Sequence, residues 1–132
     1  MLDVPDSFQD LLDDKTKAYA FFATIMPDGS PQITPVWFSV AGEHILINSN
    51  AGRVKDRNIR ANPKVAMVIM RLDQHFRYLQ IRGEVVKITT EGAVEHINFL
   101  SNKYDDHDFN LPDNHARVIY KIKPLNWSTY AY

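Results

Sequence analysis

YAFFATIMPDGSPQITPVWF, residues 19–38, predicts a β-hairpin. Its two halves, Tyr19–Met26 and Gln32–Phe38, are rich in the aromatic and β-branched residues that favour strands. Pro27-Asp28-Gly29-Ser30 supplies turn residues between them, and Gly29 can adopt a positive φ. Because Pro35 cannot donate a hydrogen bond to a neighbouring strand, we expect the second strand to lie at a sheet edge or to be interrupted there.

Further strands are predicted after the hairpin, at residues 44–49, 65–70, 78–86 and 117–122. The first of them follows a tight turn at Ala41-Gly42. Val65–Met70 is apolar throughout, so we expect it to be buried on both sides. Gly83 marks a bulge or a close approach of two backbones. Lys123-Pro124 is expected to turn the chain out of the last of these strands into a final segment.

Two short helices are predicted in the first half of the chain. Residues 6–14 place apolar side chains on one helical face, namely Phe8, Leu11 and Leu12. We expect this segment to lie across a barrel opening. The second helix follows the basic segment after Gly52 and ends at Asn62-Pro63, because a residue before proline is disfavoured in the helical region.

Thr90 is expected to cap a third helix that runs to about Tyr104. One face of this helix carries Ala93, Ile97, Leu100 and Tyr104. Many short strands with few helices between them leave little room for parallel crossovers. The expected fold class is therefore mainly β with a few helices, arranged as an antiparallel barrel.

Composition indicates a single domain, residues 1–132, with a net charge of −1. The near balance of acidic and basic residues argues against a whole-surface grip on nucleic acid or on a membrane. The sequence holds no cysteine, which excludes disulfides, thiol nucleophiles and cysteine metal sites. The acidic start does not resemble a signal peptide, and no apolar run reaches transmembrane length, so we expect a cytoplasmic protein.

The basic segment Arg53-Val54-Lys55-Asp56-Arg57 is the first candidate binding site. Ser49 and Asn50 end the preceding strand, and Gly52 lets the backbone bend into a helix whose first amides are free. Such donors converge well on a phosphate. The alternative is a solvated basic helix end, although cations at a helix N-terminus oppose its dipole by roughly 0.3–1 kcal/mol each, which an anion would relieve.

The second candidate is the wall formed by Gln32–Phe38. A flat aromatic cofactor needs an apolar wall with a few directed polar groups. Taken alone, the segment is better explained as an edge strand whose Trp37 and Phe38 belong to the core. His107, in Asp105-Asp106-His107-Asp108, matches no metal-ligand spacing and is expected on the surface, so we expect no metal.

Together these features resemble the FMN-binding split-barrel superfamily of pyridoxamine 5'-phosphate oxidase-like proteins, in particular the small branch that includes deazaflavin-dependent reductases. The motifs that carry the resemblance are Phe22-Ala23-Thr24, Pro27–Gln32, Thr34–Phe38 and Arg53–Pro63. The resemblance extends to about Val86 and weakens afterwards. It implies a split antiparallel β-barrel with short helices at the openings. It also implies a homodimer with the cofactor, FMN or alternatively the 8-hydroxy-5-deazaflavin coenzyme, in a groove between subunits.

The resemblance also assigns roles to residues. Arg53 and Lys55 match the phosphate-binding positions, with Ser49 or Asn50 nearby and Arg57 as a further candidate. The strand that lines the isoalloxazine ring and ribityl chain is matched by Gln32, Thr34, Pro35, Val36 and Trp37. Residues around Tyr78 and Arg82 are candidates for reaching the cofactor from the partner subunit.

The function implied is a flavin- or deazaflavin-dependent oxidoreductase that transfers hydride to a small organic acceptor. The substrate-phosphate residues of true pyridoxamine phosphate oxidases are not found, so vitamin B6 oxidation is not expected. No side chain stands out as a catalytic acid or base. One alternative is a non-catalytic flavin- or haem-binding carrier or stress protein. Another is an oligonucleotide-binding barrel using the basic cluster, which the near-zero net charge disfavours.

Overall fold

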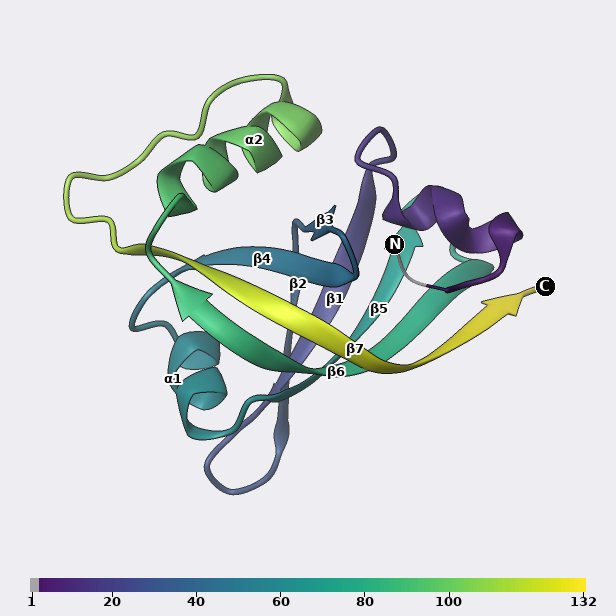
Figure 1. The fold of residues 1–132 in the computed structure, drawn as a ribbon, viewed down its shortest axis with the longest axis horizontal. Coiled ribbons are helices and arrows are strands. Elements are labelled where there is room, and N and C mark those ends of the chain that lie inside the picture. Colours follow the sequence, from purple (N-terminus) through teal and green to yellow (C-terminus); the bar gives the residue numbers. More distant parts are fainter. Residues whose placement is uncertain (1–2) are drawn as a thin grey trace.

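The computed structural model describes residues 3–132 and consists mainly of one antiparallel sheet (Figure 1). The strands run in the spatial order β2-β1-β5-β6-β7-β4-β3. Their bounds are β1 Ala18–Ile25, β2 Pro31–Val36, β3 Ser39–Ala41, β4 His44–Asn50, β5 Lys64–Arg71, β6 Arg77–Thr89 and β7 Arg117–Ala131. The helices are the 3-10 helix η1 (Asp6–Leu12) and the α-helices α1 (Val54–Ala61) and α2 (Ala93–Asp105).

The predicted hairpin is confirmed as β1 and β2. Thr24 pairs with Gln32 across it, and Gly29 in the turn has φ +88°. β2 is an edge strand, which is where a strand can accommodate Pro35. The strand stops at Val36, however, so Trp37 and Phe38 lie in the connection to β3 rather than in β2.

This connection spans the split of the barrel. β2 and β3 are the two edges of the sheet and do not pair with each other within residues 3–132. The α2 helix lies over β4 and the start of β7 (Figure 1). Tyr104 of this helix donates a hydrogen bond from its hydroxyl to the Ala18 carbonyl. The same hydroxyl accepts a hydrogen bond from the Phe38 amide at 3.5 Å. One side chain of α2 thus joins β1 to the β2–β3 connection.

The barrel interior is filled by alternate residues of the strands, as a half-buried sheet requires. Phe22, Ile47 and Ile81 are completely buried there. The predicted apolar face of η1 is confirmed, since Phe8, Leu11 and Leu12 are buried against this core. An Arg77–Asp10 ion pair of 2.6 Å fixes η1 to β6.

Three helix predictions have different outcomes. α1 ends at Ala61, directly before Asn62-Pro63, as expected. The apolar face of α2 is also confirmed, because Ala93, Ile97, Leu100 and Tyr104 are buried. Capping by Thr90 is wrong: α2 begins after Gly92, which has φ +73°, and no side chain caps it. A glycine that adopts this conformation without strain positions the helix start instead.

Two strand predictions are corrected. β5 is not buried on both sides, because Ala66, Val68 and Met70 on its outer face remain half-exposed. β7 does not end at Pro124 but continues through it. The β6–β7 register shifts between Arg82 and Gly83, opposite this proline, so the irregular pairing accommodates the missing amide donor.

The close approach expected at Gly83 is confirmed. A Cβ atom at this position would lie 2.5 Å from the Lys123 carbonyl oxygen, closer than real Cβ contacts allow. Glycine therefore lets β6 and β7 approach each other where their register shifts.

Candidate functional site

The basic turn is anchored to the barrel by the buried side chain of Asp56. Its carboxylate accepts hydrogen bonds from the Tyr120 hydroxyl at 2.6 Å, the Gly52 amide at 3.0 Å and Arg60 Nε at 3.0 Å. Burial raises the pKa of this carboxyl, but the hydrogen bonds outweigh burial and hold its pKa below the usual value. Asp56 therefore fixes the first turn of α1 and is engaged inside the barrel.

Lys55 brings the basic turn to the edge strand. Its Nζ lies 3.3 Å from the Thr34 hydroxyl oxygen on β2. Burial, followed by the charges of Arg53 and Arg117, lowers the pKa of the Lys55 ammonium. Within residues 3–132, no carboxylate forms an ion pair with Lys55 or Arg53. The positive charges at this turn are thus left for an anion to neutralise.

Alternate residues of β2 differ in burial, and Thr34 is the one that contacts α1 through Lys55. Gln32, Thr34 and Val36 are half-buried, whereas Pro35 lies exposed between them. Gln32 accepts a 2.7 Å hydrogen bond from Thr24, and Asn58 of α1 donates to the same hydroxyl at 3.0 Å. Of the predicted wall, Gln32, Thr34 and Val36 therefore share one face, and Pro35 lies on the other.

Trp37 belongs to the aromatic cluster beneath α2. Its ring stacks on Tyr104 with centroids 5.2 Å apart and an angle of 5°, and it meets Phe109 edge-on at 6.5 Å. Phe38, by contrast, is part of the barrel core. The two neighbouring aromatic residues thus serve different clusters.

The remaining predicted residues surround the turn without all facing Lys55. Ser49 is buried beside Tyr120. Asn50 uses its side-chain oxygen to accept the Ala116 amide at 2.7 Å. Arg57 donates to the Gly52 carbonyl at 2.6 Å and lines a hollow on the opposite side of α1. Lys55 is therefore the predicted cation that contacts β2, and the charge of Arg53 acts on it from the preceding turn.

Sequence reasoning missed a buried polar network beside these cations. Arg117 Nε donates to Asn48 Oδ1 at 2.8 Å, and Asn48 Nδ2 donates to His96 Nδ1 at 3.1 Å. The other ring nitrogen of His96 lies 2.9 Å from the Ser39 hydroxyl. Burial, and then Arg117, lowers the pKa of His96 to about 4, so the ring is neutral at pH 7. No spacing in the sequence connects these residues. The pairing of β4 with β7 brings Asn48 near Arg117, and the packing of α2 against β4 adds His96.

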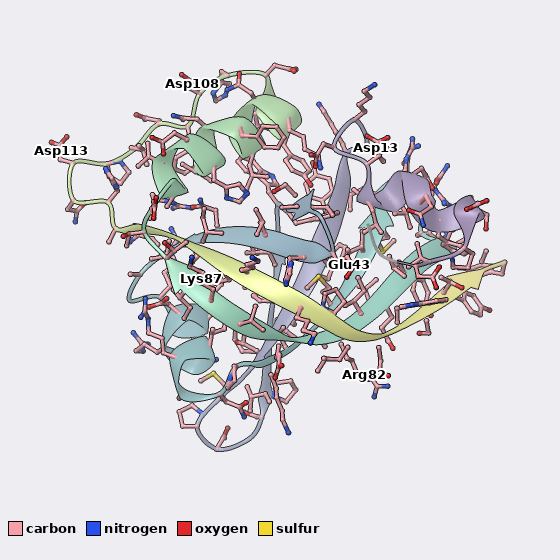
Figure 2. The ribbon with its side chains drawn as sticks, in the orientation of Figure 1. Asp13, Glu43, Arg82, Lys87, Asp108 and Asp113 are labelled. Carbon is pink, nitrogen blue, oxygen red and sulfur yellow. The ribbon has the colours of Figure 1, made fainter. Side chains whose placement is uncertain are left out.

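The outer face of the sheet is apolar and only half covered. A hollow of about 420 Å³ is lined there by Ala23, Ala66 and Leu125 among others. Arg82 also borders it, and Figure 2 shows this side chain reaching away from the sheet. None of the helices within residues 3–132 has the length and apolar character needed to cross a membrane.

Several proteins of known structure have a similar fold. An F420 reductase of known structure is 35% identical, with a TM-score of 0.83 over 95% of this chain and 98% of the other. A conserved hypothetical protein from Mycobacterium tuberculosis is 20% identical, with a TM-score of 0.75 over 97% and 85%. HupZ from Group A Streptococcus is 19% identical, with a TM-score of 0.69 over 96% and 93%. No curated protein matches the chain.

The likenesses under 25% identity establish the split-barrel fold alone, whereas the F420 reductase likeness extends to sequence. The sequence also matches the family model described as pyridoxamine 5'-phosphate oxidase over residues 5–131. The expected superfamily and split-barrel fold are both confirmed. The chain therefore belongs to the pyridoxamine 5'-phosphate oxidase family, whose oxidoreductases work with flavin-type cofactors.

Proposed function

We propose that this protein is an oxidoreductase that binds FMN or a phosphorylated deazaflavin and transfers hydride to a small organic acceptor. The observation that carries the proposal is the 3.3 Å contact between Lys55 Nζ and the Thr34 hydroxyl. It brings Lys55, which has no acidic partner in the described part of the chain, to the strand expected to line the cofactor. The F420 reductase likeness supports a deazaflavin as the cofactor, and the family match supports FMN equally well.

The residues present fit such a cofactor. Arg53 and Lys55 would hold its phosphate, with Ser49 and Asn50 close to the turn. The strand face formed by Gln32, Thr34 and Val36 would lie along the ribityl chain, with Trp37 beyond it. When bound, the ring supplies the redox chemistry, by hydride or single electrons for FMN and by hydride alone for a deazaflavin. The chain's own contribution is to grip, orient and shield it.

A spectrum and a binding titration test this proposal. The purified protein should carry, or bind with micromolar or better affinity, either FMN or the 8-hydroxy-5-deazaflavin coenzyme F420. The absorption and mass of a co-purified molecule then distinguish the two. If the chain binds neither cofactor, the proposal fails.

The outer sheet face supports a homodimer with the cofactor groove completed by the second copy. Phe21, Ala23, Ala66 and Val68 form a half-exposed apolar surface on β1 and β5, beside the highly exposed Ile33. Surfaces of this kind mark association sites. Sedimentation at micromolar concentration should give a dimer, whereas a monomer would refute the assembly.

The single domain over residues 1–132 and the cytoplasmic location stay predictions.

A carrier without turnover is the second candidate. It is favoured by the state of His96, which is neutral and uses both ring nitrogens in hydrogen bonds, so it is not poised to exchange protons with a substrate. Stopped-flow reduction of the bound cofactor, followed by turnover with an acceptor, would exclude a carrier. Binding of flavin or haem without any turnover would support it.

A further inference from the structure

Arg117 is a buried cation whose charge has no acidic partner among the residues that the structure describes. It is the first residue of β7 and is only 9% exposed. Within residues 3–132 its guanidinium forms no ion pair, and its hydrogen bond from Nε goes to the neutral amide of Asn48. Buried arginines are normally paired, because an uncompensated buried charge is unfavourable. The position is therefore costly unless an anion reaches it.

The guanidinium is held in a defined orientation. Phe109 covers it at 5.2 Å from the ring centroid, and Asn48 Oδ1 accepts the hydrogen bond from Nε at 2.8 Å. Asn48 is itself fixed, because its amide nitrogen donates to the Ala93 carbonyl at 2.8 Å and to His96 Nδ1. With Nε engaged, the terminal amino groups of Arg117 make no hydrogen bond within residues 3–132 and remain available as donors.

The same guanidinium acts electrostatically on the basic turn. Its charge lowers the pKa of Lys55, and Arg53 in turn lowers the pKa of Arg117, although burial is the larger cause for both groups. Phe109 also contacts Trp37, which directly follows the strand that carries Thr34. In the sheet Arg117 is paired with Asn50, which comes three residues before Arg53, so Arg117 lies next to the basic turn.

We infer that Arg117 is a phosphate-binding residue of the cofactor site, and that Asn48 and His96 position it. The inference rests on the proposed function only where it assigns the bound phosphate to a cofactor. The anion site itself does not depend on the proposed function. Asn48 fixes the guanidinium through Nε, and His96 fixes Asn48 by accepting from its amide nitrogen. A dianionic phosphate monoester would then meet cations from α1 and from β7 together.

Inorganic phosphate and two flavins separate the possible outcomes. Phosphate should raise the melting temperature of the wild type, and Arg117→Gln should abolish most of that rise. Arg117→Gln should also weaken FMN binding by about 10- to 100-fold while changing riboflavin binding, which involves no phosphate, by less than about twofold. Lys123→Gln, an exposed cation of the same strand, serves as the matched control and should behave as wild type.

The outcomes distinguish this inference from the proposed function. If no flavin or deazaflavin binds but phosphate still stabilises the protein through Arg117, the proposed function fails and the anion site stands. If Arg117→Gln lowers FMN and riboflavin affinity equally, or keeps the full response to phosphate, the inference is wrong. An unresponsive wild type, with neither phosphate nor FMN having an effect, overturns it as well.

The positioning role has its own pair of variants. In His96→Asn the new amide oxygen can still accept from Asn48, whereas His96→Phe removes the acceptor. We expect FMN affinity to fall about 3- to 10-fold in His96→Phe and to stay within about twofold of wild type in His96→Asn, with riboflavin affinity unchanged in both. Equal FMN affinities in folded samples of the two variants would exclude His96 as a positioning residue.

Discussion

At the residue scale, Lys55 combines a stability cost with the phosphate-binding role that we propose for it. Its ammonium is half-buried, touches a neutral hydroxyl and is repelled by neighbouring arginines. In a folded protein such a charge lowers stability, since desolvation is not compensated by an opposite charge. Its retention makes sense where an anion supplies that charge during function. Stability and binding should therefore respond in opposite directions when the ammonium is removed.

Lys55→Met tests this opposition, because it keeps the aliphatic stem and removes the charge. Without ligand, the free energy of unfolding should be unchanged or higher by up to about 1 kcal/mol, while FMN affinity falls about 10- to 100-fold. Urea denaturation and a fluorescence titration measure the two effects. Arg57→Met is the control, since Arg57 contacts the Gly52 carbonyl, and its FMN affinity should change less than about threefold. A large loss of unliganded stability in Lys55→Met would contradict the argument.

His96 should make stability depend on pH in a defined window. In the unfolded chain it takes up a proton near pH 6.5, whereas the folded chain excludes that proton until about pH 4. Wild-type stability should therefore fall as the pH drops from about 6.5 to about 4, relative to His96→Asn, by about 2–3 kcal/mol in total. Parallel urea titrations of both proteins across this range provide the measurement. Curves that stay parallel would show that His96 is not buried as a neutral group.

At the scale of elements, α1 is a short helix fastened at one end. Asp56 in its first turn receives hydrogen bonds from the β7 hydroxyl of Tyr120 and from the Gly52 backbone. Asn58, one turn along, reaches β1 through Thr24. The helix is too short to persist alone, so these contacts determine where the basic turn lies.

Asp56→Ala should therefore destabilise the fold and displace the basic turn. Loss of the acceptor leaves the Tyr120 hydroxyl and the Gly52 amide unsatisfied, which should cost about 2–4 kcal/mol by urea denaturation. Tyr120→Phe removes only one of the three donors and should cost about 1 kcal/mol. Similar losses for both variants would show that Asp56 does not organise the turn.

The elements that were predictable carry local signals. The β1–β2 turn, the end of α1 at Asn62-Pro63 and the apolar face of α2 each follow from a few neighbouring residues. The predicted end of the strand at Pro124 was wrong, because a register shift against β6 lets β7 continue through the proline. Such a shift depends on the partner strand and has no local signal. The prediction that Thr90 caps α2 was wrong, because the helix begins after Gly92, two residues later.

The residues of the candidate site also differ in whether a local sequence signal predicts them. Arg53 and Lys55 could be proposed from the sequence because they follow a strand end and a glycine in one continuous segment. Arg117 was not, because its place beside them arises from the pairing of β7 with β4, in which it lies opposite Asn50. Asn48 and His96 likewise meet across 48 residues of sequence, and no single-segment pattern predicts such a contact.

At the scale of the whole molecule, the half-exposed outer face of β5 has a direct bearing on assembly. The sequence of β5 is apolar on both faces, yet one chain covers only the inner one. A second copy placed against Ala66 and Val68 would bury the outer face as well. β5 would then be buried on both faces, as strands with a continuous apolar sequence usually are.

Ala66→Glu tests whether assembly and cofactor binding depend on this face. A charge here should convert the dimer to a monomer and weaken FMN binding at least about 10-fold, since an unpaired charge is not tolerated inside an interface. Analytical ultracentrifugation and a cofactor titration follow the two effects. Asp113→Lys, in the exposed loop before β7 (Figure 2), should leave both unchanged. A variant that is monomeric but binds cofactor normally would place the whole site within one chain.

The edge strand β2 also affects whether a single chain tends to aggregate. Ile33 is 64% exposed there and would invite another strand to add on. Pro31 and Pro35 flank it, and each removes an amide donor from the open edge. The same strand that is expected to line the cofactor therefore carries its own protection against aggregation, which keeps newly made chains available for correct pairing.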